Sequence, residues 1–335
     1  MNPCCSKFAF EILFDESGKS YGAPRWKYEK RVDWILDNVN LPSGSTILDL
    51  GCHDGELLSM LPDSFKRVGV DIDQSSLSAG KKKYPDIHFI KADLESFQFE
   101  GKPDAITMIH VLEHLPDPAA VLHNLHSISH GETLLVIEVP IIEKGATADI
   151  SGFFSVTHLT HFSSSGLRRF LHSTGWQVLK WEVEPSYNGL RVLAKSACRS
   201  GRPETSLEET GLLYDYLAEH YRSLAKVEQR LSKATCEQLC VIWGAGLHTE
   251  LLYQSASFFR QDSGREYIIV DSDPLKWGKS WRGIPICKPE MLKNIDWNKS
   301  SLVISSYASQ SVIERAAKDL GVPNDKIVKI YDIEG

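Results

Sequence analysis

The chain twice passes from an apolar run through closely spaced glycines into a stretch with helical spacing. The first passage is TILDLGCHDGELL at residues 46–58, and the second is VIWGAGLHTELL at residues 241–252. Further apolar runs of strand length follow each passage and alternate with stretches of helical spacing. This alternation is typical of a parallel sheet with helices on both faces. The sequence therefore predicts two α/β domains, of which the second is smaller.

The first domain is expected to cover residues 1–198. A helix is expected at 27–40, and strands are expected at 46–50, 67–72, 87–93, 104–111 and 133–140. A helix at 164–176 follows, with Ser164 or Ser165 as N-cap and Gly175 as its stop. Two strands, 177–184 and 190–196, then flank a turn at Asn188-Gly189 and form an antiparallel hairpin.

A helical linker is expected at residues 199–236. Apolar residues recur there at steps of three and four, and Thr205 with Glu208 can form a capping box at the start of the helix. The apolar stripe must pack against something, so the 205–232 helix is either a strut between domains or a homodimer contact. The second domain then covers residues 237–335.

Composition excludes several classes of protein. The 335 residues carry a net charge of −7, whereas a general nucleic-acid binder is more often basic. No apolar run is long enough to span a bilayer, and the N-terminus lacks the pattern of a signal peptide. Seven scattered cysteines without a CxxC pair argue against a zinc ribbon or a disulfide framework. We therefore expect a cytoplasmic protein with no nucleic-acid or membrane partner.

The first glycine turn has the chemistry of a nucleoside site. Gly51 and Gly55 let the backbone approach a ligand closely, and the N–H groups of the following helix suit an anion. Asp71 ends the second strand, where an acid can accept both ribose hydroxyls. The run from Gly51 to Gly55 is not a strict GxGxxG. A nucleoside that carries an amino acid is therefore favoured over a dinucleotide.

Four motifs, in the same order as in a known family, point to one class of enzyme. ILDLGCHDGELL, VGVDID, KADLE and DAITMIHVLEHLPDP resemble the successive motifs of class I S-adenosylmethionine-dependent methyltransferases. The resemblance implies a Rossmann-like seven-stranded sheet, which fits the expected hairpin, and S-adenosyl-L-methionine as cofactor. A structural reading of each residue as a turn glycine or a capping acid is the alternative.

The resemblance also assigns residues to parts of the cofactor. Asp49, Gly51 and Gly55 would line its methionine end. Asp71 would hold the ribose, with Ile72 against the adenine. The full set of cofactor-binding residues is Asp49, Gly51, Cys52, Gly55, Asp71, Ile72, Asp93, Leu94, Ile109 and His110. Of these, Asp93 and Leu94 would flank the adenine, and Ile109 and His110 would close over the cofactor.

A rival motif overlaps the fourth strand. His110-Val111-Leu112-Glu113-His114 matches the H-x-x-E-H signature of inverted metallopeptidases, with Glu182 or Glu184 as a distant third ligand. That signature needs both histidines on one helical face. Pro116 and Pro118 follow at once, so such a helix would be very short. No metal is therefore expected at this motif.

The acceptor is expected to bind at the long loop after the fifth strand. HLTHFSSSGLRRFLHSTGW resembles the same region of methyltransferases that act on sugars and other small hydroxylated metabolites. In sugar C-methyltransferases this place reads roughly Glu-His-x-x-Tyr, and here Thr157, His158 and His161 occupy it. Those enzymes also carry an N-terminal cysteine-rich zinc motif, which is absent from this chain. O- or N-methylation is therefore favoured, and O-methylation comes first.

His158 and His161 are the candidate catalytic bases. A hydroxyl acceptor benefits from a base, and histidine suits this role near its unperturbed pKa. The alternative is that both are loop or capping histidines. A metal held by this pair is a further alternative, but no carboxylate partner is evident in the sequence.

The second glycine turn resembles the C-terminal Rossmann-like domain of some nucleotide-sugar methyltransferases. Gly244 and Gly246 could cradle a phosphate, and Asp271 or Asp273 could meet a ribose. A scaffold that keeps the glycines only for the turn is favoured slightly, because a lone GxG is a weak signal.

Methyl transfer to a saccharide, a nucleotide sugar or a related small metabolite is the function that these observations favour. Two alternatives stay open. One is a nicotinamide-dependent oxidoreductase that uses the second turn, and the other is a non-catalytic nucleotide- or sugar-nucleotide-binding protein.

Overall fold

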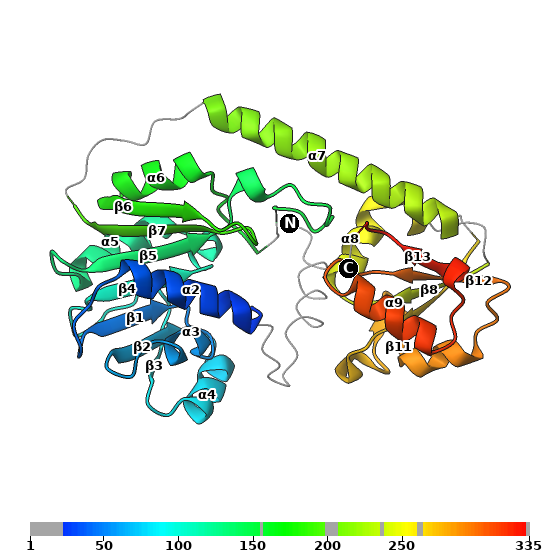
Figure 1. The fold of residues 1–335 in the computed structure, drawn as a ribbon, viewed down its shortest axis with the longest axis horizontal. Helices are drawn as coiled ribbons and strands as arrows, with labels where there is room; N and C mark the ends of the chain where they lie inside the picture. The colour runs from blue at the N-terminus through cyan, green and yellow to red at the C-terminus, as the bar shows by residue number, and fades with distance from the viewer. Residues whose placement is uncertain (1–22, 155–156, 198–206, 235–237, 260–263, 333–335) are drawn as a thin grey trace. The chain divides into compact units, whose positions relative to one another are not determined.

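Two compact units make up the chain in a computed structural model (Figure 1). The structure describes residues 23–154, 157–197, 207–234, 238–259 and 264–332. One unit contains the described residues of 23–145 and 153–216, and the other contains 146–152 and the described residues from 217 onward. The linear boundaries expected at 198 and 236 are therefore approximate, because a loop segment and half of a helix belong to the second unit.

The first unit is built on a seven-stranded sheet, as expected. The strand order is β3-β2-β1-β4-β5-β7-β6, in which β7 runs antiparallel to both β5 and β6. The strands are β1 (Thr46–Leu50), β2 (Lys66–Asp71), β3 (His88–Lys91), β4 (Ala105–Ile109), β5 (Leu134–Val139), β6 (Trp176–Val183) and β7 (Leu190–Ser196). The predicted antiparallel hairpin is β6 and β7.

Helices connect these strands close to the expected positions. The helices of this unit are α2 (Arg25–Asn38), α3 (Glu56–Ser59), α4 (Gln74–Lys83), η1 (Leu112–His114), α5 (Pro118–Ile128), η2 (Ile142–Lys144) and α6 (Ser164–Ser173). The N-cap of α6 is Ser163 and not Ser164 or Ser165, because the Ser163 hydroxyl accepts from the Gly166 N–H. Gly175 follows the helix with a φ of 88°, which suits its predicted role as a stop.

Both faces of the sheet are covered by helices. Ile47 packs in a cluster with residues of α2, α3 and α4, whereas its neighbour Leu48 packs in a cluster with residues of α5 and α6. Successive residues of a strand point to opposite faces, so β1 reads as a nearly continuous apolar run. This double coverage leaves the ends of the strands as the place for a site.

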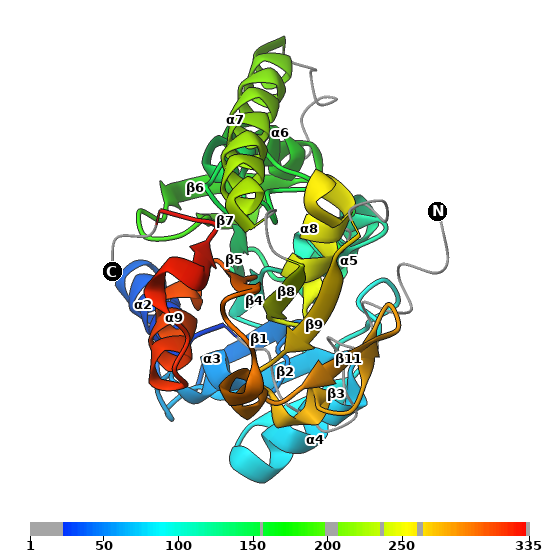
Figure 2. The ribbon, with the colours of Figure 1, turned by 90° about the vertical axis from the view of Figure 1, so that its right-hand side faces the viewer.

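The second unit is a smaller α/β domain, as predicted. Its sheet has the order β10-β11-β9-β8-β12-β13, and β8, β9 and β11 run side by side (Figure 2). The strands are β8 (Leu239–Trp243), β9 (Glu266–Val270), β10 (Ser280–Trp281), β11 (Ile284–Cys287), β12 (Ser300–Ile304) and β13 (Ile327–Lys329). The helices are η3 (Ser232–Ala234), α8 (Leu247–Ser255), η4 (Ser257–Phe259), η6 (Pro274–Lys276), η7 (Pro289–Asn294), α9 (Gln310–Asp319) and η8 (Asn324–Lys326).

The segment 146–152, which belongs to the loop after β5, packs in the second unit. Ile150 is buried in the core of that unit, and its N–H donates to the Tyr331 hydroxyl. The Ser223 hydroxyl donates to the carbonyl oxygen of Thr147. The loop in which the acceptor is expected to bind is thus held in part by the second unit.

The long helix α7 (Leu207–Leu231) divides between the two units. The Tyr216 hydroxyl accepts a hydrogen bond from the Phe153 N–H in the first unit. Val227 and Leu231 are buried in the core of the second unit. Residues of α7 thus pack within each unit, and both interpretations of the helix, as a strut or as a homodimer contact, stay predictions. Thr205, which was expected to cap the helix, lies outside the described residues.

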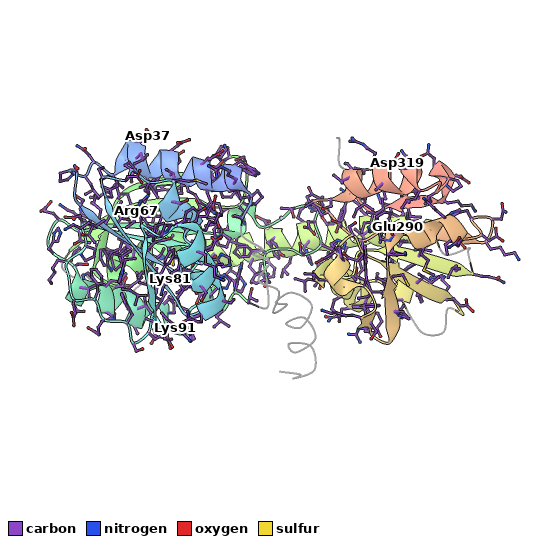
Figure 3. All side chains as sticks on the ribbon, turned by 90° about the horizontal axis from the view of Figure 1, so that it is seen from below. Asp37, Arg67, Lys81, Lys91, Glu290 and Asp319 are labelled. Carbon is purple, nitrogen blue, oxygen red and sulfur yellow. The ribbon has the colours of Figure 1, made fainter. Side chains whose placement is uncertain are left out.

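Exposed charges of both signs lie on each unit. They include Asp37 and Lys81 on the first unit and Glu290 and Asp319 on the second (Figure 3). Among the helices that the structure describes, none combines the length and the apolar character needed to cross a membrane.

Two helical glycines should respond in opposite ways to substitution by alanine. A β carbon at Gly80 in α4 would lie 2.6 Å from the Asp54 carbonyl oxygen, whereas one at Gly211 in α7 would meet nothing within 4 Å. We expect Gly80→Ala to lower the free energy of unfolding by about 1–3 kcal/mol through overpacking. Gly211→Ala should raise it by about 0.5–1 kcal/mol, because glycine is a poor helix former. Urea unfolding of both variants measures the difference, and an equally stable Gly80→Ala protein would contradict the packing of α4 on the glycine turn.

Candidate functional site

The predicted cofactor residues gather at one edge of the seven-stranded sheet. The strands β3, β2, β1 and β4 are parallel neighbours, so their carboxyl ends meet. Asp49 lies near the end of β1, Asp71 ends β2, Asp93 follows β3, and His110 follows β4. Ligands of open α/β sheets bind in the crevice outside these ends.

The glycine turn after β1 requires its glycines. Gly51 has a φ of 75° and Gly55 a φ of 80°, in the left-handed region that side chains rarely adopt. A β carbon on Gly51 would lie 2.4 Å from a methyl carbon of Val111, and one on Gly55 would lie 2.6 Å from the ring of Phe89. The turn is therefore fixed both by conformation and by close packing.

Asp71 holds the turn and keeps acceptor capacity for a ligand. Its Oδ2 accepts from the His53 N–H at 2.8 Å, and its Oδ1 accepts from the Asp73 N–H at 2.9 Å. A carboxylate has about four lone-pair sites, so each oxygen can accept one further hydrogen bond, as two ribose hydroxyls would require. Ile72 beside it is 64% exposed, which leaves an apolar surface for a planar ring.

Asp49 is a buried acid at the methionine end of the expected cofactor site. The Thr107 hydroxyl donates to its Oδ1 at 2.5 Å. Burial raises the pKa of Asp49 to about 7, with a smaller contribution from the negative charge of Asp71, while the hydrogen bond from Thr107 and the charge of Arg31 oppose the shift. A cationic group bound nearby would stabilise the ionised form of Asp49.

The remaining cofactor candidates differ in what they offer. Asp93 is exposed beyond β3, and Leu94 is half-buried against the core. Ile109 is half-buried at the end of β4. Cys52 is buried in the core, its N–H donates to Val70, and burial raises the pKa of its thiol. The side chain of Cys52 therefore packs inside the turn, and its contact with the cofactor stays a prediction.

His110 lies between two carboxylates. Its Nδ1 is 3.0 Å from Glu113 Oε1 and its Nε2 is 3.0 Å from Glu138 Oε1. Burial by itself lowers the pKa of His110, but the hydrogen bonds with both carboxylates outweigh burial and raise this pKa. Both ring nitrogens can donate only in the protonated ring. His110 has a φ of 55°, and η1 that follows has three residues, so His110 and His114 do not share a helical face as a metallopeptidase signature would require.

Glu138 is the centre of a buried charge network that the sequence prediction missed. Its carboxylate accepts from Arg31 Nε at 2.8 Å, from Arg191 Nε at 2.7 Å and from the Tyr187 hydroxyl at 3.0 Å, besides its contact with His110. Burial by itself raises the pKa of Glu138, but His110 and Arg31 outweigh it and lower this pKa. A lone acid in the apolar run LLVIEV is the signal in the sequence that could have identified Glu138.

The long loop after β5, named the acceptor loop because the acceptor is expected to bind there, brings His158 close to η1. The N–H groups of Leu159 and Thr160 donate to the Glu113 carbonyl oxygen at 2.8 and 3.1 Å. The His158 ring packs edge-on against the His114 ring, with centroids 4.8 Å apart. Burial lowers the pKa of His158, so the neutral base form is favoured.

His161 lies on the other side of this loop, with its ring centroid 6.1 Å from that of His158. It contacts Phe153 and Phe154, and burial lowers its pKa. It also lines a cavity of about 490 Å³ whose wall includes Phe153, Phe154, Phe162 and Phe170. The structure thus brings His158 to the sheet edge and His161 to an aromatic cavity.

The second glycine turn has the same hydrogen-bond scheme, but its acid is occupied. Asp271 accepts from the Ala245 and Asp273 N–H groups at 2.7 and 2.8 Å, and Lys276 Nζ lies 2.9 Å from its Oδ2. A β carbon on Gly244 would lie 2.7 Å from the Ser305 carbonyl oxygen, so this glycine serves packing. These contacts favour the scaffold interpretation of the turn.

His248 after this turn is also paired within the protein. Its Nδ1 is 3.0 Å from the Ser305 hydroxyl and its Nε2 is 2.5 Å from the Tyr331 hydroxyl. Burial lowers the pKa of His248 to about 4, although the charge of Asp149 opposes the shift. The start of α8 therefore carries a neutral histidine whose ring nitrogens already have partners.

Comparisons with known proteins agree with this geometry. A family model described as a methyltransferase domain matches residues 25–180. The ubiquinone biosynthesis O-methyltransferase of Pseudomonas aeruginosa (strain UCBPP-PA14) is 30% identical over 200 residues, which cover 57% of this chain and 78% of that protein. The protein of the same name from Erwinia tasmaniensis is 31% identical over 100 residues, which cover 28% of this chain and 41% of that protein.

Coverage is partial for several of the relatives. The chain spans between 41% and 48% of the length of the first four curated relatives that it matches. Among solved structures, the magnesium protoporphyrin IX methyltransferase of Synechocystis PCC 6803 with bound SAH is 19% identical, has a TM-score of 0.45, and matches over 58% of this chain and 100% of its own. The glycine turn, the acid at the end of β2, the matched family model and the Pseudomonas relative all agree. The chain therefore belongs to the class I S-adenosylmethionine-dependent methyltransferases, and S-adenosylmethionine is its cofactor.

Proposed function

We propose that the chain transfers the methyl group of S-adenosylmethionine to a hydroxyl of a small acceptor, such as a saccharide, a nucleotide sugar or a related metabolite. The observation that carries this proposal is the position of His158, a half-buried histidine with a lowered pKa, beside η1 at the cofactor edge of the sheet. The O-methyltransferase relatives support oxygen as the methylated atom.

The residues of the sheet edge fit the cofactor. Asp71 offers acceptors for the ribose, Ile72 offers an apolar face for the adenine, and ionised Asp49 would attract the ammonium group of the methionine end. The bound cofactor supplies an activated methyl on a sulfonium. The chain's own task is then to position an acceptor in line with that methyl and to exclude water.

His158 and His161 are proposed to act on the acceptor. The oxygen–carbon bond forms as the carbon–sulfur bond breaks with its electron pair on sulfur, and the hydroxyl proton passes to a base. A neutral imidazole can take that proton, and such a base contributes about 10²–10⁴-fold to the rate. His158 is the first candidate, because it lies beside η1, and His161 is a second contact for the acceptor.

A second class of acceptor has one observation in its favour. The cavity beside His161 is lined by four phenylalanines, and such a wall suits an aromatic or apolar group better than a saccharide. An aromatic hydroxyl is therefore the second candidate. Incubation with methyl-labelled S-adenosylmethionine and panels of saccharides, nucleotide sugars and phenols separates the two classes. Label found on carbon or nitrogen by NMR, or no transfer to any hydroxyl in these panels, would refute O-methylation of such acceptors.

Removing the acid of β2 should weaken cofactor binding. Asp71→Ala loses the ribose acceptors and the anchor of the His53 N–H. Hydrogen bonds to a charged group are worth about 1.5–3 kcal/mol, so the affinity for S-adenosylhomocysteine should fall by about tenfold to a hundredfold. Calorimetric titration measures it, with Asp37→Ala, an exposed acid on α2, as the control. An unchanged affinity in Asp71→Ala would disprove this placement of the ribose.

Cofactor affinity should depend on pH through Asp49. Folding raises the pKa of this acid from 3.8 to about 7, so ionised Asp49 costs stability in the unliganded protein, and this cost grows as pH rises between those values. Because the ionised form attracts the cofactor's ammonium group, affinity for S-adenosylhomocysteine should fall as pH is lowered through about 7. Titrations across this range should give a flatter profile for Asp49→Asn. The same pH dependence in both proteins would exclude Asp49 as the titrating group.

Loss of the candidate base should slow turnover selectively. We expect His158→Ala to reduce kcat by about 10²–10⁴-fold. Its affinity for S-adenosylhomocysteine should stay the same, because His158 lies on the acceptor loop. His172→Ala, on the exposed side of α6, is the matched control. A wild-type rate in His158→Ala would leave His158 a structural residue.

A further inference from the structure

Three side chains from two separate segments converge beside the end of β4. Glu113 and His114 belong to η1, and His158 belongs to the acceptor loop. One ligand atom from each of these residues lies within 4.8 Å of the other two. The group combines one carboxylate with two imidazoles, which is the set of ligands that divalent transition metals take in many proteins.

Hydrogen bonds hold the two segments together at this point. His114 Nδ1 is 2.9 Å from the Thr157 carbonyl oxygen, and the N–H groups of Leu159 and Thr160 donate to the Glu113 carbonyl oxygen. These contacts flank His158 on both sides along the chain. The loop is therefore fixed where His158 faces η1, and the cluster is a built feature of the first unit.

The carboxylate of Glu113 is only half-satisfied. Glu113 is 1% exposed; its Oε1 pairs with His110, but its Oε2 has no hydrogen-bond partner among the described residues. His158 Nδ1 is likewise buried and has no partner in the described part of the chain. A buried polar atom without a partner is destabilising, so these two atoms indicate a missing cationic partner.

The position of the ring proton of His114 suits this residue to bind a metal ion. Its Nδ1–H donates to a backbone carbonyl, which leaves the lone pair of Nε2 free in the neutral ring. Metal-bound histidines usually donate their other ring N–H to a carbonyl or a carboxylate in this way. The hydrogen bond from His114 to the Thr157 carbonyl therefore plays the part of an orienting contact.

The spacing of the three ligand atoms fits an ion better than a direct contact. No hydrogen bond or ion pair joins the Glu113 carboxylate to His114 or His158 in the described residues. Two ligand atoms of a tetrahedral metal with bonds of about 2.0–2.2 Å stand about 3.4 Å apart. The observed limit of 4.8 Å therefore needs a closure of at most about 1.4 Å, which side-chain rotation and a small loop movement can supply.

We propose that Glu113, His114 and His158 bind a divalent transition-metal ion and leave coordination positions open on the acceptor side. The carboxylate that His158 and His161 lacked in the sequence is Glu113, and His110 is not a ligand because both of its nitrogens face carboxylates. The ion would bind the acceptor oxygen and favour its deprotonated form, and His158 would then act as a metal ligand in place of the base. This second part rests on the proposed methyl transfer, whereas metal binding itself does not.

Cobalt(II) tests metal binding without cofactor or acceptor. After dialysis against a chelator, the full chain should bind one equivalent of Co²⁺ with a visible absorption band typical of nitrogen ligation, and excess Mg²⁺ should not displace it. We expect His158→Ala and Glu113→Gln to weaken binding at least tenfold. His172→Ala is the matched histidine control and should bind like the wild type. Circular dichroism and thermal unfolding confirm that each variant is folded, and His158→Ala on the loop decides the result if Glu113→Gln does not fold.

The results of these experiments separate the metal site from the proposed methyl transfer. Failure of the wild type to bind Co²⁺, or full binding by folded His158→Ala, would overturn the metal site. Metal binding without methyl transfer to any acceptor would support the site and count against the proposed function. Methyl transfer at an undiminished rate after chelation would overturn the role of the ion in the reaction.

Discussion

A buried carboxylate organises the middle of the first unit's sheet and the turn after β4. Glu138 lies in the middle of the sheet, where β5 meets the antiparallel β7, and it pairs with Arg31 of α2, Arg191 of β7 and His110 after β4. Removing one partner from such a buried network costs about 3–5 kcal/mol, because a charge is left without compensation. The packing of α2 on the sheet, the pairing of β5 with β7 and the position of the turn after β4 therefore all depend on the Glu138 side chain.

Two successive contacts, from Glu138 to His110 and from His110 to Glu113, connect this network to the loop that carries His158. Glu138 orients His110, and His110 takes one oxygen of Glu113. The other oxygen of Glu113 is left facing the loop that carries His158, and the backbone of Glu113 holds that loop. The position of His158 beside η1 thus depends on charges buried in the sheet. The side chain of His110 is paired within this network, and its closure over the cofactor stays a prediction.

The two glycine turns show why a shared pattern does not mean a shared ligand. In each turn, the acid at the end of the second strand accepts two backbone N–H groups. Asp71 has no further protein donor among the described residues, whereas Asp271 is also paired with Lys276. The first turn therefore keeps acceptor sites of the kind that a ribose would need, whereas the carboxylate of the second turn is already paired with a lysine.

The sequence by itself determined the two α/β units, the antiparallel hairpin that ends the first sheet, and the acids at the strand ends. These features follow from local periodicity and from the rule that parallel strands share an edge. The N-cap of α6, the pairing of Glu138 with Arg31 and Arg191, and the convergence of Glu113, His114 and His158 were decided by the tertiary structure. Each of these depends on how segments far apart in the chain pack together, and no local pattern of residues encodes that packing.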